Sequence, residues 1–378
     1  MYAHPWALAE MGVEAALDEL GDLGVDGLQL ALSYHVASFL TPRSPRGRVR
    51  AGDLGSVSVR YERGDNGLRP TVHVPAAEAV PKVLSAAAGR GMQVIAWLVY
   101  LYDHDLAGRY PDVAVRNAFG DVHPAQLCPS QPAVRDYVLG LTSAVVELRA
   151  SSDGLTGLHA ESLSCLPWDY GLLGLKTAVA LGQETARLLG LCFCEACRRR
   201  ALEAGIEVEK IAEHVRDRVD AGLSTGFMGA PDPVDAVAPY QDLLAGVTTE
   251  LNRAVAALVY ARDLRFSSTA AEPMAGRADD ASRSAVRTLV DEVRVKVQPG
   301  ASDEEVTLQR AAALSGCRPG THEFAQYQLQ QFTSYADLER AVMAAVSAGI
   351  EHHRFYEHSV LTDQHLEWLR RIRRWMST

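Results

Sequence analysis

The chain has 378 residues, of which 48% are hydrophobic and 22% charged, so it can bury a large core and does not belong to the disordered class. Its net charge of −10 at pH 7 argues against nucleic acid as a partner, because phosphate binding needs a basic face. No run of roughly 18 apolar residues could span a membrane, and no basic, apolar-cored leader is seen at the start. We therefore expect a cytoplasmic protein whose partner is a small molecule or an oligosaccharide.

In chain order, eight short β-type runs that end in polar residues alternate with helical stretches. The runs are Tyr2–Ala7, Gly27–His35, Gln93–Asp103, Gly154–Glu161, Asp263–Ala270, Glu292–Gln298, Thr321–Gln328 and Gly349–Tyr356. Alternating strand and helix signals predict parallel βαβ units, and eight units in one chain of this length predict an α/β fold, a single (β/α)8 TIM barrel over residues 1–378. An open doubly wound sheet is the alternative, which is weakened because no G-x-G-x-x-G follows the first strand.

The stretches between the runs predict the helices and the loops. Amphipathic patterns predict helices at Val13–Leu23, Val80–Gly89, Val134–Arg149, Ala281–Val290, Glu304–Leu314, Tyr335–Ala348 and Gln364–Trp375. Two long irregular connections, Val36–Val74 and Asp103–Ser130, follow strands and should lie on the catalytic face. We interpret residues 165–262 as a helical insertion after strand four that could act as a lid or pair two subunits as a homodimer. Its helical periodicity lies at Ala178–Leu189, Ala196–Ala204 and Val234–Val259.

The fourth strand ends in LHAES, and alternation places His159 and Glu161 on one side and Leu158 and Ala160 on the other. The apolar pair can face the helices, so the polar pair should face the barrel mouth. A carboxylate at the mouth is a candidate acid, base or nucleophile, and a histidine beside it can contact the substrate. The alternative is a structural Glu161 that pairs with an Arg or Lys at the rim.

Glycosidases usually need two carboxyl groups, one to protonate the leaving oxygen and one to attack or to activate water. Glu161 is the first candidate for this catalytic pair. Its partner stays open among Glu272, just past strand five, Glu357, at the end of strand eight, and Asp103. A solvated carboxylate is the alternative in each case.

Polar and aromatic residues at the ends of strands two and three are candidates for substrate binding. On strand two, alternation would place Ser33 and His35 on the interior side, where a satisfied core histidine is the alternative. Strand three ends in aromatic and acidic residues, and aromatic faces can stack on sugar rings. The residues that we expect to shape a sugar pocket are Tyr34, His35, Tyr102, Asp103 and Trp168.

Three of the six cysteines, Cys192, Cys194 and Cys197, form a C-x-C-x2-C motif. A structural zinc site wants four ligands, which are commonly thiolates, and Cys165 or Cys128 could complete the set. The alternative is that the three cysteines pack the insertion as small apolar residues. No other cofactor is expected to be required.

Several stretches resemble a group of largely uncharacterised bacterial TIM-barrel proteins of the glycoside-hydrolase-like type. They are GVDGLQLALSYHVASFLTPR (24–43), YPDVAVRNAFGDVHPAQLCPSQPAVRDYV (110–138), LHAES (158–162) with LCFCEACRRRALEAG (191–205), and RFYEHSVLTDQHLEWLRRIRRW (354–375). The resemblance spans nearly the whole chain, and its LCP and C-x-C-x2-C motifs are the most specific. It implies a (β/α)8 barrel that acts on carbohydrate. The residues to which it points are Tyr34, His35, Asn117, Cys128 and Glu161.

The chain departs from this family in two places. Relatives tend to be His-rich after LHAES, where this chain reads LSCLPWDYGLLGLK, and Glu357 stands where the closing motif usually has Asn. These departures indicate a different substrate or a retired hydrolase. We therefore expect a glycosidase, with two alternatives. One is a sugar lyase, isomerase or epimerase in which His159 or His35 moves protons, and the other is a non-catalytic carbohydrate-binding barrel.

Overall fold

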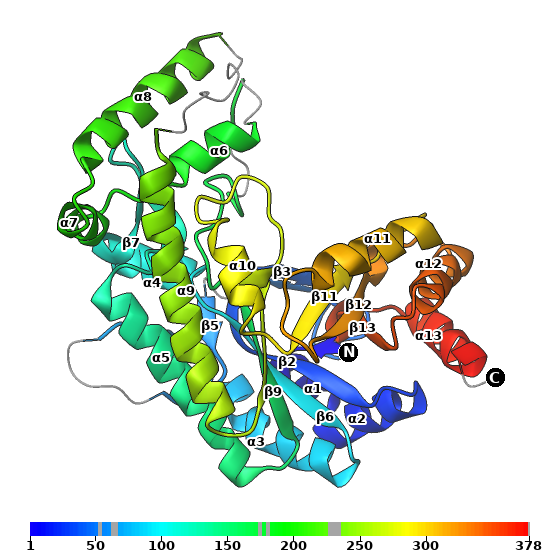
Figure 1. Cartoon of the computed structure of the whole chain (residues 1–378). Coiled ribbons are helices and arrows are strands. Elements are labelled where there is room, and N and C mark those ends of the chain that lie inside the picture. The colour runs from blue at the N-terminus through cyan, green and yellow to red at the C-terminus, as the bar shows by residue number, and fades with distance from the viewer. Residues whose placement is uncertain (52–54, 62–66, 173–175, 179–181, 226–235, 377–378) are drawn as a thin grey trace.

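The computed structural model describes residues 1–378 except 52–54, 62–66, 173–175, 179–181, 226–235 and 377–378. Eight parallel strands form a nearly closed barrel (Figure 1). Their order is β1 (Tyr2–Ala3), β2 (Gly27–His35), β6 (Gln93–Val99), β9 (Leu155–Glu161), β10 (Arg265–Ser268), β11 (Glu292–Lys296), β12 (His322–Gln328) and β13 (His352–Tyr356). Each strand lies within one of the eight runs identified in the sequence, so the predicted (β/α)8 barrel is confirmed.

The barrel closes between β1 and β13 through side chains, and we call this junction the seam. Among the described residues, no backbone ladder joins the two strands. The rings of Tyr2 and Tyr356 meet edge-on with centroids 5.4 Å apart, and the hydroxyls of Tyr34 and Tyr356 share a hydrogen bond of 2.7 Å. Arg354 of β13 also donates to Oε1 of Gln29 on β2 at 3.2 Å.

Helices cover the outside of the barrel. They are α1 (Pro5–Met11), α2 (Val13–Asp22), α3 (Val74–Gly89), α5 (Pro132–Val146), α9 (Ala238–Tyr260), α10 (Ser282–Arg287), α11 (Asp303–Leu314), α12 (Tyr335–Ser347) and α13 (Asp363–Met376). Local sequence sets where some of them begin, as in the capping box that Ser302 and Glu305 form at α11. Outward-facing strand residues such as Leu98 and Leu158 belong to the main apolar core beneath the helices. None of the helices in the described ranges is both long and apolar enough to cross a bilayer.

The inside of the barrel carries many polar and charged side chains, whereas branched apolar residues usually fill such barrels. The buried carboxylate of Glu292 is shared by two guanidinium groups, 3.1 Å from Arg265 and 2.7 Å from Arg354. Two residues further along β11, Arg294 pairs with Glu272 at 2.5 Å. Neighbouring strands are therefore joined across the interior by specific ion pairs as well as by backbone hydrogen bonds.

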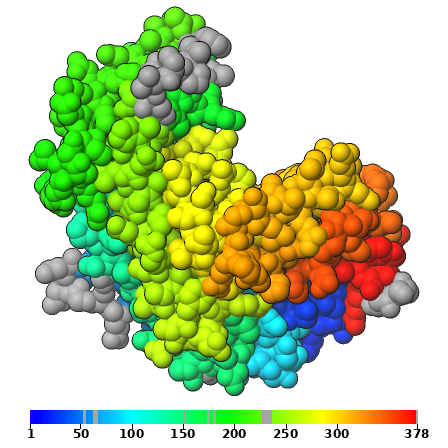
Figure 2. Space-filling model, in the orientation of Figure 1, coloured from blue at the N-terminus to red at the C-terminus, as the bar shows by residue number. Residues whose placement is uncertain are grey.

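Three helices that follow β9 in the sequence form an arm that projects from the barrel (Figure 1). Its helices α6 (Gln183–Leu189), α7 (Glu195–Glu203) and α8 (Val208–Thr225) share a separate apolar cluster. The long helix α9 contacts the arm at α7 and packs on the barrel helices α5 and α10. In the space-filling view, the arm and α10 stand on one side of a broad notch and α11 on the other (Figure 2).

The sequence located these helices only in part. Helix α8 was not predicted. Within the helix expected at Ala178–Leu189 the structure shows α6 at Gln183–Leu189, and within the one expected at Val234–Val259 it shows α9 from Ala238 onward. Residues 179–181 and 234–235 of these two predictions lie outside the described residues. The two long connections that we predicted to be irregular contain short elements. These are β3 (Ser38–Leu40), β4 (Val49–Ala51), β5 (Gly55–Val57), α4 (His104–Arg109), β7 (Ala114–Arg116) and β8 (Val122–Leu127). Strand β5 pairs antiparallel with the end of β2 and therefore extends the sheet at the carboxyl face.

A buried ion pair fixes the segment after β10 to the start of the arm. Asp279 is fully buried, and its Oδ1 accepts from Nε of Arg277 at 3.0 Å. Its Oδ2 accepts from the backbone N–H of Cys165 at 3.0 Å and from the hydroxyl of Thr248 on α9 at 2.5 Å. One carboxylate thus connects three segments that are far apart in the sequence.

Candidate functional site

Glu161 is the last residue of β9, the fourth barrel strand, and lies beside Trp97 of the neighbouring strand β6. The indole Nε1–H of Trp97 donates a hydrogen bond of 2.7 Å to Oε2 of Glu161. Trp97 is buried in the barrel, so the donor has a fixed position, whereas Glu161 is only half-buried. A carboxylate held by a rigid donor at the carboxyl end of a barrel strand is suited to act on a bound ligand.

Tyrosine side chains surround this carboxylate. The rings of Tyr2, Tyr34 and Tyr356 pack around Trp97 with centroid distances of 5.2, 5.0 and 6.0 Å. Burial first, and the charge of Glu161 second, raise the pKa of Tyr170 to about 12, so this fourth tyrosine is also close to the carboxylate. Aromatic faces with hydroxyl tips can stack on a sugar ring and bond its hydroxyls.

A second carboxylate and two cations lie near Glu161. Glu272, just after β10, accepts from Nη2 and Nε of Arg294 on β11 at 2.5 and 3.2 Å. The charge of Arg294 lowers the pKa of Lys296 on the same strand, while the charges of Glu272 and Glu161 act on it in the opposite direction. Glu161 and Glu272 are therefore both near enough to Lys296 to act electrostatically on its ammonium group.

His159 lies inside the barrel, two residues before Glu161 on β9. Its Nδ1 is 2.9 Å from the hydroxyl of Ser267, and its Nε2 has no hydrogen-bond partner among the described residues. Burial lowers the pKa of His159, so the ring is neutral. The structure places this residue below the mouth, with one nitrogen still free to accept or donate a proton.

Glu357 is buried beside His4, the residue that precedes the first helix. It is 1% exposed, its carboxylate lies 3.9 Å from Nε2 of His4, and the hydroxyl of Ser359 donates to it. The ring of His4 in turn packs edge-on against Tyr34. Burial raises the pKa of Glu357 to about 7, so the group is partly protonated at neutral pH.

We expect Glu357→Gln to stabilise the protein increasingly as the pH rises. The folded-state pKa of about 7 exceeds the ordinary value of 4.5, so the folded protein binds more protons between these values and loses stability as the pH rises through them. At about 1.4 kcal/mol per pKa unit, the variant should gain about 3 kcal/mol over wild type above pH 7. Urea unfolding from about pH 5 to 8 measures the difference, and a difference that does not change with pH contradicts the prediction.

His35, Tyr102 and Asp103 lie together, but they make different kinds of contact. The ring of His35 stacks on Tyr34 with centroids 4.3 Å apart and meets Tyr102 edge-on at 5.2 Å. Asp103 is buried and accepts from the backbone N–H of Leu106 at 2.9 Å, so it caps α4. Burial raises the pKa of Asp103 to about 6. Gly55, with φ of +145°, passes so close to this carboxylate that any side chain there would clash.

Asn117 and Trp168 hold loop structure. The side-chain oxygen of Asn117 accepts from the backbone N–H groups of Phe119 and Asp121 at 2.9 and 3.0 Å, which forms the turn between β7 and β8. The ring of Trp168 packs edge-on against His123 with centroids 5.1 Å apart. In the described contacts, neither residue touches Glu161.

Cys128, at the end of β8, joins the C-x-C-x2-C cysteines. The Sγ atoms of Cys128, Cys192, Cys194 and Cys197 all lie within 4.8 Å of one another, and all four residues are buried. The Sγ of Cys128 is 3.4 Å from that of Cys197 and 3.6 Å from that of Cys194. Tetrahedral zinc with Zn–S bonds of about 2.3 Å holds sulfurs about 3.8 Å apart, so these four thiols fit the ion. Cys165, the other candidate fourth ligand, is not in the group.

Sequence reasoning missed three of these residues: Trp97, Tyr356 and Arg294. Alternation within the Gln93–Asp103 run places Trp97 on the inward side and could have identified it. Arg294 stands between Glu292 and Lys296 at every second position of β11, so one face of that strand is fully charged. A charged face on a strand of a parallel barrel indicates that these side chains have a role inside the barrel.

The strand order defines a (β/α)8 barrel, and several solved structures share this fold. An α-L-fucosidase, isoenzyme 2 from Paenibacillus thiaminolyticus, has a TM-score of 0.55 and 14% identity over 94% of this chain and 44% of its own. A GH42 β-galactosidase from G. stearothermophilus has a TM-score of 0.57 and 10% identity over 100% of this chain and 56% of its own. A cold-adapted β-galactosidase from Rahnella sp. has a TM-score of 0.50 and 12% identity over 94% of this chain and 50% of its own.

The chain therefore spans about half the length of these structures, and the likeness concerns the fold. No protein-family model matches the chain. No curated protein matches it in sequence.

Proposed function

We propose that the chain is a glycoside hydrolase that acts on a small glycoside or an oligosaccharide at the carboxyl face of the barrel. The observation that carries the proposal is Glu161, held by Trp97 among tyrosines and with Glu272 nearby. The three similar structures are named as glycosidases, which agrees with this chemistry. Two carboxylates are what glycosidic cleavage needs.

In this mechanism Glu161 donates a proton to the glycosidic oxygen as the bond to the anomeric carbon breaks. Glu272 either attacks that carbon or takes a proton from the attacking water. Its ion pair with Arg294 would hold the carboxylate in position for either role. Water supplies the new hydroxyl of the sugar. If Glu272 attacks the carbon, the proton of the water that later releases the sugar returns to Glu161; if Glu272 activates the water, it passes that proton to solvent and Glu161 regains one from solvent. The hydroxyls of Tyr34 and Tyr356, which bond each other at 2.7 Å, would bond the sugar in this proposal.

A panel of chromogenic glycosides and oligosaccharides, with products separated by chromatography, tests the proposal. We expect at least one member to release its aglycone or a shorter saccharide. A Glu304→Gln control, which changes an exposed carboxylate on α11, should hydrolyse it at the wild-type rate. No hydrolysis of α- or β-linked substrates across neutral and acidic sugars would reject the proposal.

A sugar lyase, isomerase or epimerase is the second candidate, and one observation favours it. Glu272 is tied to Arg294 and Glu357 is buried, whereas Glu161 takes part in no ion pair among the described residues. Proton transfer by Glu161 and the nearby His159 would then not need a second free carboxylate. Products of unchanged mass, or unsaturated sugars, would appear in the same panel in place of hydrolysis products.

We also propose that the four-cysteine cluster holds a structural zinc ion. Cys128 follows the β7–β8 hairpin and the other three cysteines surround the start of α7, so the ion would tie the arm to the barrel loops. A thiolate is the form of cysteine that binds zinc. Hydrogen bonds among the thiols lower the pKa of Cys194 and raise that of Cys128, so Cys194 is the thiol that these contacts favour as a thiolate. Four buried thiolates leave no open position, which is typical of structural sites.

Metal analysis should find about one zinc ion per chain in the native protein, and Cys194→Ser should lose most of it. The variant should also melt at lower temperature, because zinc binding contributes folding free energy. Cys317→Ser is the matched control, since this half-buried cysteine lies outside the cluster. Native protein without metal, or Cys194→Ser with full zinc content, would contradict the proposal.

A further inference from the structure

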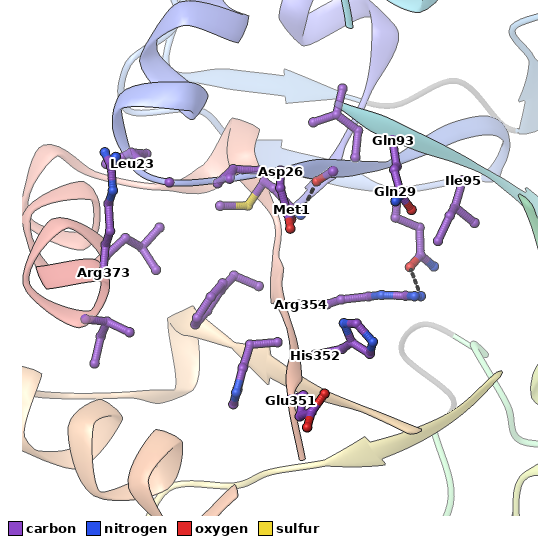
Figure 3. A pocket seen from close by; sticks show the side chains of 18 of the residues that line it. Met1, Leu23, Asp26, Gln29, Gln93, Ile95, Glu351, His352, Arg354 and Arg373 are labelled. Atoms are coloured by element: carbon purple, nitrogen blue, oxygen red, sulfur yellow. Dashed lines mark hydrogen bonds between the residues drawn. The ribbon is translucent and has the colours of Figure 1, made fainter. Parts of the chain in front are cut away.

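A cavity of about 520 Å³ opens at the amino-terminal face of the barrel, at the opposite ends of the strands from Glu161 (Figure 3). It is lined by residues at or near the starts of five strands, among them Gln29, Gln93, Arg265, Glu292 and Arg354. Strand β9 alone is about 20 Å long, so this cavity is separate from the carbohydrate site proposed above. Its size is typical of pockets for small molecules.

The floor of the cavity carries one positive charge in excess. The guanidinium groups of Arg265 and Arg354 share a single carboxylate, that of Glu292. Arg354 donates a further hydrogen bond to Oε1 of Gln29, which is drawn in Figure 3. Two cations with one anion leave a net charge that a monovalent anion would balance.

A buried hydrogen-bond donor at this floor has no partner. Gln29 is 2% exposed, and its Nε2 has no hydrogen-bond partner among the described residues. Its Oε1 faces Arg354, which fixes the amide so that Nε2 is the group left over. Buried donors are paired in nearly all native structures, so this one points to an acceptor that a ligand would bring.

The walls and the rim restrict the ligand further. Leu23, Val25 and Ile372 give the cavity apolar walls, which favour a ligand with an apolar part. The exposed carboxylates of Asp26 and Glu351 and the exposed guanidinium of Arg373 also line the cavity, so these three side chains together add one negative charge, which disfavours an anion with more than one charge. We propose that this cavity binds an organic monocarboxylate, with its carboxylate on Gln29 and the arginine pair and its apolar part against the walls.

Isothermal titration calorimetry with phenylacetate and hexanoate tests this proposal, with hexanol as the neutral match and hexyl phosphate as the dianion. We expect at least one acid to bind and neither hexanol nor hexyl phosphate to bind as tightly. Gln29→Leu should weaken the acid at least tenfold and Val25→Trp, which fills the cavity, should abolish binding. Gln309→Leu on the exposed face of α11 is the control and should bind as wild type.

The proposal is overturned if neither acid binds, if hexanol binds equally well, or if Gln29→Leu and Val25→Trp bind as wild type. Should Gln29→Leu not fold, Val25→Trp decides the question, because it leaves the charged floor intact. Turnover of the carbohydrate substrate is measured in parallel. A loss of acid binding with unchanged turnover separates this cavity from the carboxyl-face site.

Discussion

Glu161→Gln should lower kcat by about 10²–10⁴ on glycosides whose leaving group needs a proton, since the amide cannot supply it. On aryl glycosides with an acidic phenol as leaving group, the loss should be far smaller, because that group departs without protonation. Glu272→Gln should lose activity on both kinds of substrate, since attack or water activation is needed in either case. Steady-state rates of the two variants on the two substrate classes therefore assign the two roles.

A third variant checks that Trp97 positions the carboxylate. Trp97→Phe keeps Glu161 but removes the donor at 2.7 Å, so kcat should fall to an intermediate value while KM changes little. Undiminished turnover by Glu161→Gln on all substrates would refute its catalytic role. Equal losses for Glu161→Gln on both substrate classes would refute its role as the acid.

Asp279→Ala should lower the free energy of unfolding by about 3–5 kcal/mol, because it leaves the Arg277 guanidinium as a buried, uncompensated charge. It also removes the acceptor for the Cys165 amide and the Thr248 hydroxyl, so the start of the arm loses its attachment. Chemical denaturation monitored by circular dichroism measures the loss. A fall this large corresponds to much of the stability of an ordinary domain.

Asp153→Ala is the matched control for this measurement. The side chain of Asp153 is fully exposed and pairs with Arg149 at 3.3 Å, so its removal should leave the free energy of unfolding almost unchanged. If Asp279→Ala and Asp153→Ala lowered the free energy of unfolding by similar amounts, burial would not be the reason why the Asp279 ion pair stabilises the protein. The free energy of unfolding of Asp279→Asn should lie between those of the two alanine variants, because the amide keeps one acceptor oxygen.

The fold could be predicted because each strand run carries its own pattern. In LHAES, Leu158 faces the helices while His159 and Glu161 face inward, and the other runs follow similar rules. Boundaries were harder, since the run Gln93–Asp103 continues past the strand that ends at Val99. Tyr100 there turns outward to bond Thr142 of α5 at 2.7 Å, a tertiary contact that local pattern does not encode.

The candidate site was less predictable from the sequence than the fold. It depends on the register between neighbouring strands and on contacts between residues that are far apart in the sequence. A register shift between Ala31 and Ser33 in β2 breaks the alternation that we expected, so the Ser33 hydroxyl bonds the carbonyl of Val99 and Tyr34 reaches Trp97. The fourth cysteine depends on how the β7–β8 hairpin folds back on α7, which spacing alone does not tell. Arg294 had no sequence motif to mark it as the partner of Glu272.

The seam between β1 and β13 has a thermodynamic consequence. Tyr34 and Tyr356 both close the sheet there and pack on Trp97, which bonds Glu161, so the same two hydroxyls belong to the carboxyl face and to the joint between the ends of the sheet. A sugar that bridges them would reinforce the joint and so make the whole cylinder more resistant to opening. Ligand binding and the stability of the closed barrel are then linked. A substitution of Tyr356 would weaken both.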